Sequence, residues 1–367
     1  MKPSAESDNQ LADKFSEFFI AKIAKIRQNL IHQRTNESVN AYSPPSLVSN
    51  LSSFCPATEE EVEKIILSAS KSSCKLDPVP TSLIRSVLPA LLPVITMIVN
   101  TSLSTGSFPS DLKSALVKPL LKKASLDCEL YKNYRPVSNI PFLSKVIEKA
   151  VSNRLLEYLS DNNLLENYQS AYKAHHSTET ALVYVQNRFM SLLDLGYCIL
   201  LALLDLSAAF DTVDHGILIQ FMESIGIKGT ALDWFRSYLL DRTQRVLIND
   251  SQSNPESLHF GVPQGSIMGP IIFCLYTLPL GQIIRSFGLD YTIYADDTQI
   301  FNPFTRATLT DSMKKLEQCI AAIRTWMLNN HLKINDKKNA FEVIRLWINC
   351  SVASVVRWAR IEPTFSR

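Results

Sequence analysis

Apolar residues near the start of the chain recur at three- and four-residue steps, the spacing that one face of a helix shows. Leu11, Phe15 and Ile23 follow this spacing, so residues 11–34 are expected to form an amphipathic helix. The segment 35–51 that follows is polar and contains proline, and it is expected to be a linker.

A second helix is expected from about residue 58 to residue 69. Thr58 is followed by three glutamates, and its hydroxyl can accept the Glu61 amide hydrogen while the acids meet the positive end of the helix dipole. The proline-containing stretch 75–80 predicts a turn after this helix.

Residues 86–110 carry no charge and are the membrane candidate of the sequence. Their apolar part, 87–99, is shorter than the ~20 apolar residues that a membrane span needs, and it contains two prolines. A buried helix pair with a Pro-Ala-Leu-Leu-Pro start is therefore expected.

The second half of the chain alternates short apolar runs with helical patterns. Strands are expected at 199–204, 245–248, 291–294 and 298–301, and helices at 217–225, 231–240, 271–280 and 309–327. Such a mixture favours an α+β or α/β fold around one central sheet.

Composition excludes several classes of protein. The 367 residues are 46% hydrophobic with a net charge of +2, which excludes a disordered or collagen-like chain. Charge is uneven, however: residues 113–149 hold eight Lys and Arg against three acids. Either a solvated face or a phosphate-facing surface fits this stretch.

The seven cysteines are an odd number, and no two are close in sequence, so neither a disulfide framework nor a zinc ribbon fits. Reduced thiols in an intracellular protein are expected. The polar residues 1–10 hold no signal-peptide apolar segment. We therefore expect a nuclear or cytoplasmic protein with no membrane partner.

Acidic residues end two of the expected strands. Asp296 and Asp297 lie between two β-prone triplets, so they are expected at the tip of a hairpin, and Asp205 directly follows six apolar residues. In one sheet these carboxylates can converge on Mg²⁺, as two-metal phosphoryl transfer requires.

The residues around these acids carry a resemblance. LDLSAAFDTVDH at 204–215, GVPQGS at 261–266 and YADD at 294–297 resemble, in order and spacing, motifs A, B and C of LINE-type (non-LTR) retrotransposon reverse transcriptases. Upstream, NYRPVS at 133–138 and QSAYK at 169–173, continued by HSTET at 176–180, are similar to finger motifs of the same family. Residues 75–80 and the 11–34 helix are similar to the Jockey-like group.

The resemblance implies an α+β right-hand polymerase fold with fingers and palm subdomains and a helical N-terminal extension. Its implied divisions are a helical extension and linker at 1–54, a helical lead-in and fingers at 55–198, and a palm with motifs A, B, C and part of D at 199–344. The remaining residues, 345–367, form a tail outside the family.

The resemblance also implies a reaction. An RNA-directed DNA polymerase transfers dNTPs onto a primer 3′-hydroxyl with two Mg²⁺ ions, or with Mn²⁺ in their place, so an RNA template, a DNA primer and dNTPs are the implied partners. A catalytically inactive remnant that at most binds nucleic acid is the alternative. A Mg²⁺-dependent phosphatase or nuclease using Asp205 would leave the GVPQG stretch unexplained.

Site residues follow from the matched motifs. The metal ligands are expected to be Asp205 and Asp296, with Asp297 less direct, and Phe210 matches the aromatic gate that excludes a 2′-hydroxyl. Lys338 is expected as the general acid that protonates pyrophosphate. The nucleotide contacts are expected to be Arg135, Lys173, Gln264 and Gly265, with Tyr294 and Gly261 near primer and template.

Two features depart from the family pattern. After the motif D lysine, Asn339 and Ala340 stand where the family usually has Thr-Glu, and the resemblance is expected to stop after Ile344. The arginine-rich tail looks like a frameshifted or mis-spliced end, so we expect a truncated polymerase without thumb or endonuclease. His175 and His176 lack metal-ligand spacing and are expected in a turn or on the surface.

Overall fold

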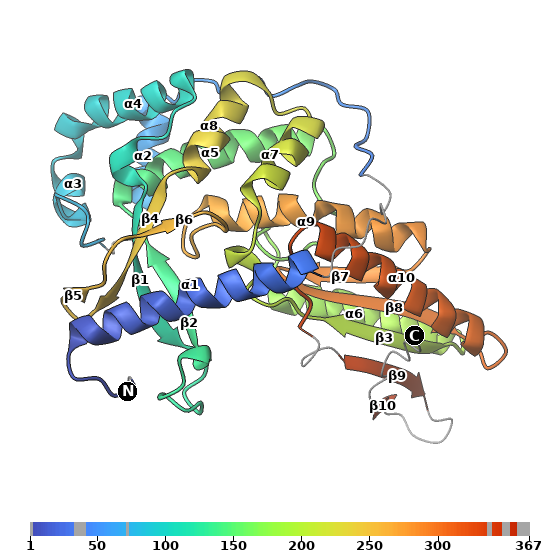
Figure 1. Cartoon of the computed structure of the whole chain (residues 1–367). Helices are drawn as coiled ribbons and strands as arrows, with labels where there is room; N and C mark the ends of the chain where they lie inside the picture. Colours follow the sequence, from blue (N-terminus) through green and yellow to red (C-terminus); the bar gives the residue numbers. More distant parts are fainter. Residues whose placement is uncertain (1–2, 33–41, 71–72, 336–339, 347–352, 358–367) are drawn as a thin grey trace. The chain divides into compact units, whose positions relative to one another are not determined.

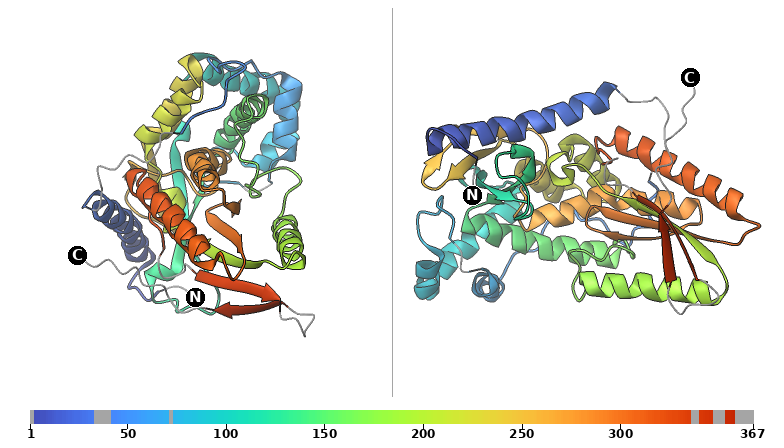
Figure 2. Two further views of the ribbon diagram at one scale, coloured as in Figure 1. Left: turned by 90° about the vertical axis from the view of Figure 1, so that its right-hand side faces the viewer. Right: turned by 90° about the horizontal axis from the view of Figure 1, so that it is seen from below.

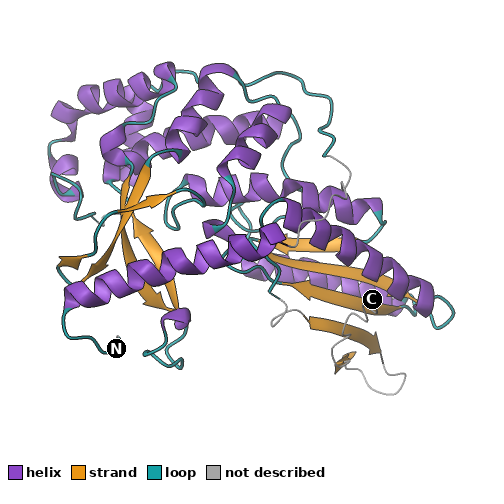
Figure 3. Cartoon of the chain, in the orientation of Figure 1, coloured by secondary structure: helices purple, strands orange, loops and turns teal. Residues whose placement is uncertain are grey.

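A computed structural model describes residues 3–32, 42–70, 73–335, 340–346 and 353–357 of the chain. Helices and strands are mixed throughout these ranges (Figures 1 and 3), and the fold is α+β. Two compact units are present, and both are built from separate stretches of chain. Unit 1 is Met1–Asn29, Ser43–Leu165 and Phe210–Ile272, and unit 2 is Leu30–Tyr42, Glu166–Ala209 and Phe273–Arg367.

Unit 1 contains a mixed sheet and several helices. Its helices are α1 (Asp8–His32, whose last turn belongs to unit 2), α2 (Glu59–Ser68), α3 (Thr81–Ser86), α4 (Leu88–Thr105), η1 (Ser110–Leu112), η2 (Tyr131–Asn133), α5 (Phe142–Asp161), α7 (His215–Ser224) and α8 (Gly229–Leu239), with η3 (Ala209–Asp211) at its border. Its strands are β1 (Ser114–Leu121), β2 (Tyr134–Asn139), β4 (Arg242–Ile248), β5 (Ser251–Gln252) and β6 (Glu256–Leu258).

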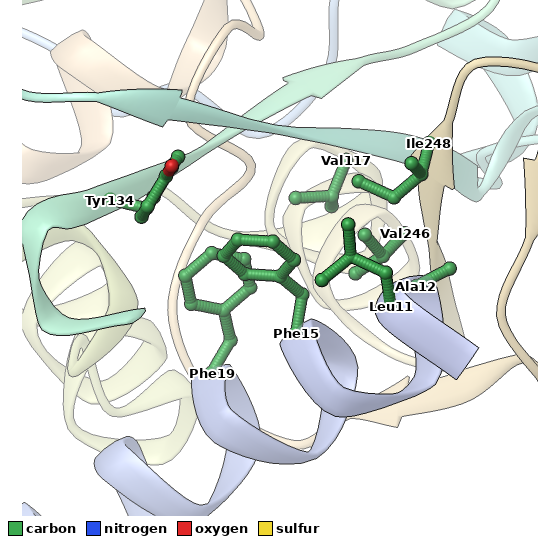
Figure 4. Close-up of a cluster of buried hydrophobic side chains, with 8 residues drawn as sticks. All are labelled: Leu11, Ala12, Phe15, Phe19, Val117, Tyr134, Val246 and Ile248. Atoms are coloured by element: carbon green, nitrogen blue, oxygen red, sulfur yellow. The ribbon is translucent and has the colours of Figure 1, made fainter. Parts of the chain in front are cut away.

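The sheet of unit 1 has the order β2-β1-β4-β5, with β6 also paired to β4. β1 is antiparallel to β2 and parallel to β4. Helix α1 lays its apolar face on this sheet, as Figure 4 shows: Phe15 and Phe19 of the helix pack with Tyr134 of β2 and with Val117 and Val246. The expected amphipathic helix is therefore confirmed. Its apolar residues recur at three- and four-residue steps because they form the face that packs on the sheet.

The prediction near α2 is confirmed, whereas the one for the uncharged stretch was wrong. The Thr58 hydroxyl accepts the Glu61 amide hydrogen at 3.2 Å, and α2 begins at the next residue. The uncharged stretch 86–110 forms one long helix, α4, which continues through Pro93, and Val94 and Met97 on it are exposed, so the expected buried helix pair does not form there.

Strands β1 and β2 were missed, because residues 113–149 were interpreted for their charge alone. Pro119 and Pro136 also weaken the strand signal, since proline cannot donate to a β-ladder. In the structure the two prolines face each other in register. The sheet tolerates them because β2 is an edge strand and the pairing of β1 with β4 ends at Val117.

Unit 2 is built around a second sheet. Its elements are α6 (Thr178–Asp194), β3 (Cys198–Leu204), β7 (Asp290–Tyr294), β8 (Asp297–Phe304), α10 (Leu309–Asn329), β9 (Ala340–Leu346) and β10 (Ala353–Arg357). Helix α9 (Met268–Ser286) begins in unit 1 and ends in unit 2. The expectation of one central sheet was wrong, because the described strands form two sheets of five strands.

The sheet of unit 2 is antiparallel, in the order β10-β9-β3-β8-β7. Helix α6 covers one face, where Leu192 packs with Leu201 and Phe301. Helix α10 covers the other face, where the Asn302 side-chain amide donates to the Ser312 carbonyl at 3.2 Å (Figure 2). Strand β3 lies between β9 and β8, contacts α6 and is buried along most of its length, which explains its unbroken apolar sequence.

Two described helices, α4 and α9, are long and apolar enough to cross a membrane by length and composition. The sequence analysis had named only the first as a candidate. Helix α9 is mostly buried, as a core helix of a soluble protein would be, so this finding is weak evidence for a membrane span.

Candidate active site

Asp205, Asp296 and Asp297 lie at the same end of the unit 2 sheet. Strand β3 ends at Leu204, which pairs with Thr298 of the antiparallel strand β8. Asp205 therefore follows β3 at the end where Asp297 begins β8, and Asp296 lies in the connection from β7. The two expected strand-end sites lie in one sheet, and the predicted hairpin is confirmed.

The connection between β7 and β8 is a tight turn with an unusual backbone. Tyr294 pairs with Asp297, leaving Ala295 and Asp296 as a two-residue loop. Ala295 has φ 58°, a left-handed conformation that costs a residue with a Cβ roughly 1–2 kcal/mol. The Gln169 side chain contacts both backbone groups of this residue.

The backbone after Asp205 is held by the motif D segment. The Asn335 side-chain amide donates to Asp205 Oδ2 at 2.7 Å, and the Asn335 backbone N–H donates to the Asp205 carbonyl at 2.8 Å. Leu206 and Ile334 form an isolated antiparallel bridge beside them. The sequence analysis assigned no role to Asn335. Lys338, the expected general acid, lies outside the described residues.

Carboxylate oxygens are the ligands that hard divalent cations prefer. The side chains of Asp205, Asp296 and Asp297 therefore offer the type of ligand atom that Mg²⁺ binds. Among the residues that the structure describes, no three His, Cys, Asp or Glu side chains lie together in a group that could hold a metal ion. The fit therefore rests on donor chemistry and on the common end of the sheet.

The motif B turn lies in unit 1 and depends on two glycines. Gly261 and Gly265 have φ 79° and 123°. A Cβ at Gly265 would lie 2.3 Å from the Ser138 carbonyl oxygen, and one at Gly261 would lie 2.8 Å from backbone atoms of Asp211. These glycines therefore allow two segments of protein backbone to pack closely, and their expected contact with nucleotide and template stays a prediction.

Backbone hydrogen bonds join motif B to the end of motif A. The Gly261 N–H donates to the Val213 carbonyl at 2.8 Å, and the Val262 N–H donates to the Phe210 carbonyl at 2.9 Å. On the other side, the Ser138 N–H donates to the carbonyl of Gln264 at 2.7 Å. The segment that carries Phe210 and strand β2 are therefore both hydrogen-bonded to the same turn.

Asp211 contacts the predicted site residue Gln264, and this contact was not expected from the sequence. Its Oδ1 accepts a hydrogen bond from Gln264 Nε2 at 2.8 Å. Burial raises the pKa of Asp211 to about 6, although the Gln264 hydrogen bond and the charge of Lys22 act in the opposite direction. Its position directly after Phe210 was the one signal in the sequence that could have found it.

A cavity of about 190 Å³ lies in unit 1 beside this pair, between α1, β2 and motif B. Lys22 and Ile23 of α1 line one side, and Asp211 and Gln264 line another. The N-terminal helix therefore takes part in shaping the surroundings of motif B.

Arg27 of α1 fastens this helix to the same region. Its guanidinium donates to Asp214 Oδ2 at 2.6 Å and lies 3.5 Å from the centre of the Phe260 ring. The other oxygen of Asp214 accepts the Ile217 N–H at 3.1 Å and caps α7. Arg27 was also missed, although a cation within the apolar stripe of a helix is a sequence signal for a buried partner.

The remaining expected residues are distributed between the units. Arg135 on β2 is exposed in unit 1, where Phe210 also lies. Lys173 and Tyr294 belong to unit 2, and Tyr294 is the last residue of β7. The two histidines expected in a turn or on the surface, His175 and His176, are exposed.

The basic stretch 113–149 presents cations to solvent. The exposed members are on and between β1 and β2: Lys118, Lys122, Lys123, Lys132 and Arg135. Exposure fits both a solvated face and a phosphate-facing surface.

Comparison with known proteins gives a match to the family model described as "Reverse transcriptase (RNA-dependent DNA polymerase)" over residues 121–355, past Ile344, where the match was expected to end. The chain is 25% identical over 336 residues to the probable RNA-directed DNA polymerase from transposon BS of Drosophila melanogaster, covering 90% of this chain and 35% of the relative. It is also 27% identical over 290 residues to the RNA-directed DNA polymerase from mobile element jockey of the same fly. This match covers 77% of this chain and 31% of the relative.

A third similar protein is the probable RNA-directed DNA polymerase from transposon X-element of Drosophila melanogaster, which is 25% identical over 274 residues, 74% of this chain and 29% of the relative. The chain thus spans about a third of the length of the curated relatives it matches.

Proposed function

Because the chain belongs to the reverse transcriptase (RNA-dependent DNA polymerase) family, we propose that it adds dNTPs to the 3′-hydroxyl of a DNA primer on an RNA template, as the polymerase of a jockey-like LINE-type element. The observation that carries this proposal is that Asp205, Asp296 and Asp297 lie at the same end of the unit 2 sheet. These residues are the acids of motifs A and C.

In this proposal the unit 2 sheet with motifs A and C forms the palm, and strands β1 and β2 with the motif B turn form the surface that meets the nucleotide. The divisions 1–54, 55–198, 199–344 and 345–367 are retained as proposed subdomain boundaries. The exposed cations on β1 and β2 are proposed to face the phosphates of the template.

Reverse transcriptases generally use divalent metal ions, and here Asp205 and Asp296 are proposed to hold two Mg²⁺ ions with help from Asp297. When bound, Mg²⁺ (or Mn²⁺) would lower the pKa of the primer hydroxyl and neutralise charge on the phosphates. Asn335 supports this role, because its side-chain amide donates to Asp205 Oδ2 and so orients the carboxylate.

The incoming nucleotide is proposed to contact residues of motifs A and B and of the upstream motifs. Phe210 excludes a 2′-hydroxyl, while Arg135 and Lys173 bind the triphosphate, Arg135 as a bidentate fork and Lys173 as a point charge. Gln264 and Gly265 contact the nucleotide and template. Since Gln264 Nε2 donates to Asp211, the amide oxygen is the group free to accept from a sugar hydroxyl.

Three further residues complete the proposed site. Tyr294 and Gly261 lie near the primer and template, and Lys338 donates a proton to the leaving pyrophosphate. Tyr294 supports its role by position, since it ends β7 directly before the turn that carries Asp296.

Primer extension tests the proposal. The wild-type chain is expected to incorporate dTTP on poly(rA)/oligo(dT) with Mg²⁺, and Asp296→Asn is expected to lower the rate by ~10²–10³, the usual loss when one group that stabilises transition-state charge is removed. Asp311→Asn, an exposed Asp of the same unit on α10, is the matched control and should retain the wild-type rate.

Equal rates for the wild type and Asp296→Asn would exclude catalysis by this polypeptide. A salt titration of RNA binding would then decide whether a steep, phosphate-dominated affinity remains, as an inactive binding remnant would show.

A further inference from the structure

We propose that Gln169 is a positioning residue for catalysis: it holds Ala295, and through it the turn that presents Asp296 and Asp297. The inference rests on the proposed function for its catalytic consequence. Its structural part concerns contacts within unit 2 alone, so it can be tested separately.

The turn needs an external support. Two-residue hairpin loops favour glycine or asparagine, because one or both loop residues must adopt positive φ. In this chain the loop is Ala295–Asp296, and Ala295 has φ 58°. Alanine disfavours this conformation, so the local sequence alone does not secure the turn.

Gln169 supplies that support with both ends of its amide. Its Oε1 accepts the Ala295 N–H at 3.0 Å, and its Nε2 donates to the Ala295 carbonyl at 3.3 Å. The same Oε1 accepts the Ala171 N–H at 2.9 Å. A primary amide can accept and donate in this way with two separate atoms, whereas a carboxylate lacks the donor and an apolar side chain lacks both.

Gln169 is itself firmly placed. The Ser170 N–H donates to the Ile293 carbonyl at 2.9 Å, and the Ile293 N–H donates to the Tyr168 carbonyl at 2.8 Å. Gln169 thus forms an isolated parallel bridge with Ile293 of β7, and Gln169 is 7% exposed. A buried amide with fixed neighbours can hold a turn without loss of further side-chain freedom.

Loss of the Gln169 side chain should affect the carboxylates of Asp296 and Asp297 and not the choice of nucleotide. Without Gln169 the two polar groups of Ala295 lose their partner, and its backbone can leave the left-handed region. Asp296 and Asp297, the next two residues, would then point in changed directions. Affinity for a divalent ion should fall, while contacts made by the motif B residues of unit 1 stay intact.

Hydrogen exchange in the full chain tests the structural part. In Gln169→Met, which preserves the shape of the side chain but neither hydrogen bond, the Ala295 amide should exchange at least about tenfold faster than in the wild type. Gln318→Met, an exposed glutamine of α10, is the matched control and should leave this amide unchanged. An unchanged Ala295 exchange rate in Gln169→Met would overturn the inference, whether or not the chain is active.

A rescue experiment tests the mechanism. Glycine adopts positive φ freely, so Gln169→Met combined with Ala295→Gly should recover most of the activity that Gln169→Met alone loses. Gln169→Met should raise the Mg²⁺ concentration for half-maximal primer extension about tenfold and change the KM for dTTP less than twofold. Mn²⁺ binding to the free chain, measured by electron paramagnetic resonance, should weaken in parallel.

The outcomes separate the two proposals. A wild-type chain that fails to incorporate dTTP contradicts the proposed function, and exchange at Ala295 with Mn²⁺ binding still decides the role of Gln169. An active wild type whose Mg²⁺ dependence is the same in Gln169→Met contradicts the positioning role alone. A larger change in KM for dTTP than in Mg²⁺ dependence also contradicts it.

Discussion

Two turns of the molecule place backbone in the left-handed region, and they do so by different means. The motif B turn of unit 1 uses Gly261 and Gly265, whereas the hairpin turn of unit 2 uses Ala295 with the side chain of Gln169. At Gly265 a Cβ would meet backbone oxygen at 2.3 Å, so no other residue fits. At Ala295 the structure has room for a Cβ. The cost that remains there is the unfavourable positive φ of the backbone.

The difference shows which kind of support each turn requires. Where backbone packs directly on backbone, space selects glycine and no neighbour can compensate. Where space is available, a distant side chain can offset the strain, and Gln169 does this from 126 positions away in sequence.

The largest expected effect comes from Gly265→Ala. Its methyl group would overlap the Ser138 carbonyl and its φ of 123° is unfavourable for alanine, so overpacking and strain together should cost about 3 kcal/mol or more of unfolding free energy. Gly196→Ala is the matched control, because Gly196 has φ 81° but no atom within 4 Å of the place that a methyl group would occupy, leaving about 1 kcal/mol of strain alone.

Urea denaturation of both variants measures the two costs. If Gly196→Ala lost as much stability as Gly265→Ala, steric exclusion would not distinguish the motif B turn, and the comparison would fail.

A pH-dependent effect of intermediate size is expected at Asp211. Because burial raises its pKa from 3.8 to about 6, the folded chain favours the protonated acid. Stability from this group is fully present below the unfolded pKa, falls as the pH rises from about 4 to about 6, and stays lost above that. Asp211→Asn does not titrate and can still accept from Gln264, so above pH 6 it should exceed the wild type by up to about 2 kcal/mol.

Denaturation from pH 4 to pH 8 checks this prediction. The gap should close toward pH 4, and Asp161→Asn, an exposed acid of unit 1, controls for the loss of one charge. A constant gap across this range would show that Asp211 does not titrate as its burial indicates.

The sequence predicted local features well because they depend on near neighbours. The apolar run before Asp205, the hairpin around Asp296 and the face of α1 are periodic patterns, and each was confirmed. Strands β1 and β2 were missed, since Pro119 and Pro136 carry a signal against strands that only the sheet's edge and register remove.

Parts of the site could not be predicted, because they join segments far apart in sequence. Asn335 bonds to Asp205 over 130 positions, and Arg27 pairs with Asp214 over 187. In neither pair does the sequence around one residue indicate which distant residue is its partner. A cation in the apolar stripe of α1 shows that a partner exists, but folding decides which acid it is.

The smallest expected effect is the change in unfolding free energy caused by Ala295→Gly alone. The sign of this change is the sharpest test of the difference between the two turns. Glycine relieves roughly 1–2 kcal/mol of left-handed strain, while the greater freedom of the unfolded chain takes back roughly 0.5–1 kcal/mol. Stability should therefore stay equal to the wild type or rise by up to about 1 kcal/mol, and primer extension should stay within twofold, because Gln169 still bonds to the same backbone groups. Urea denaturation of Ala295→Gly, carried out in parallel with Gly265→Ala, measures this change in unfolding free energy. A loss above about 2 kcal/mol would mean that the Ala295 methyl group packs against neighbours, so that contact and not the Gln169 amide secures the turn.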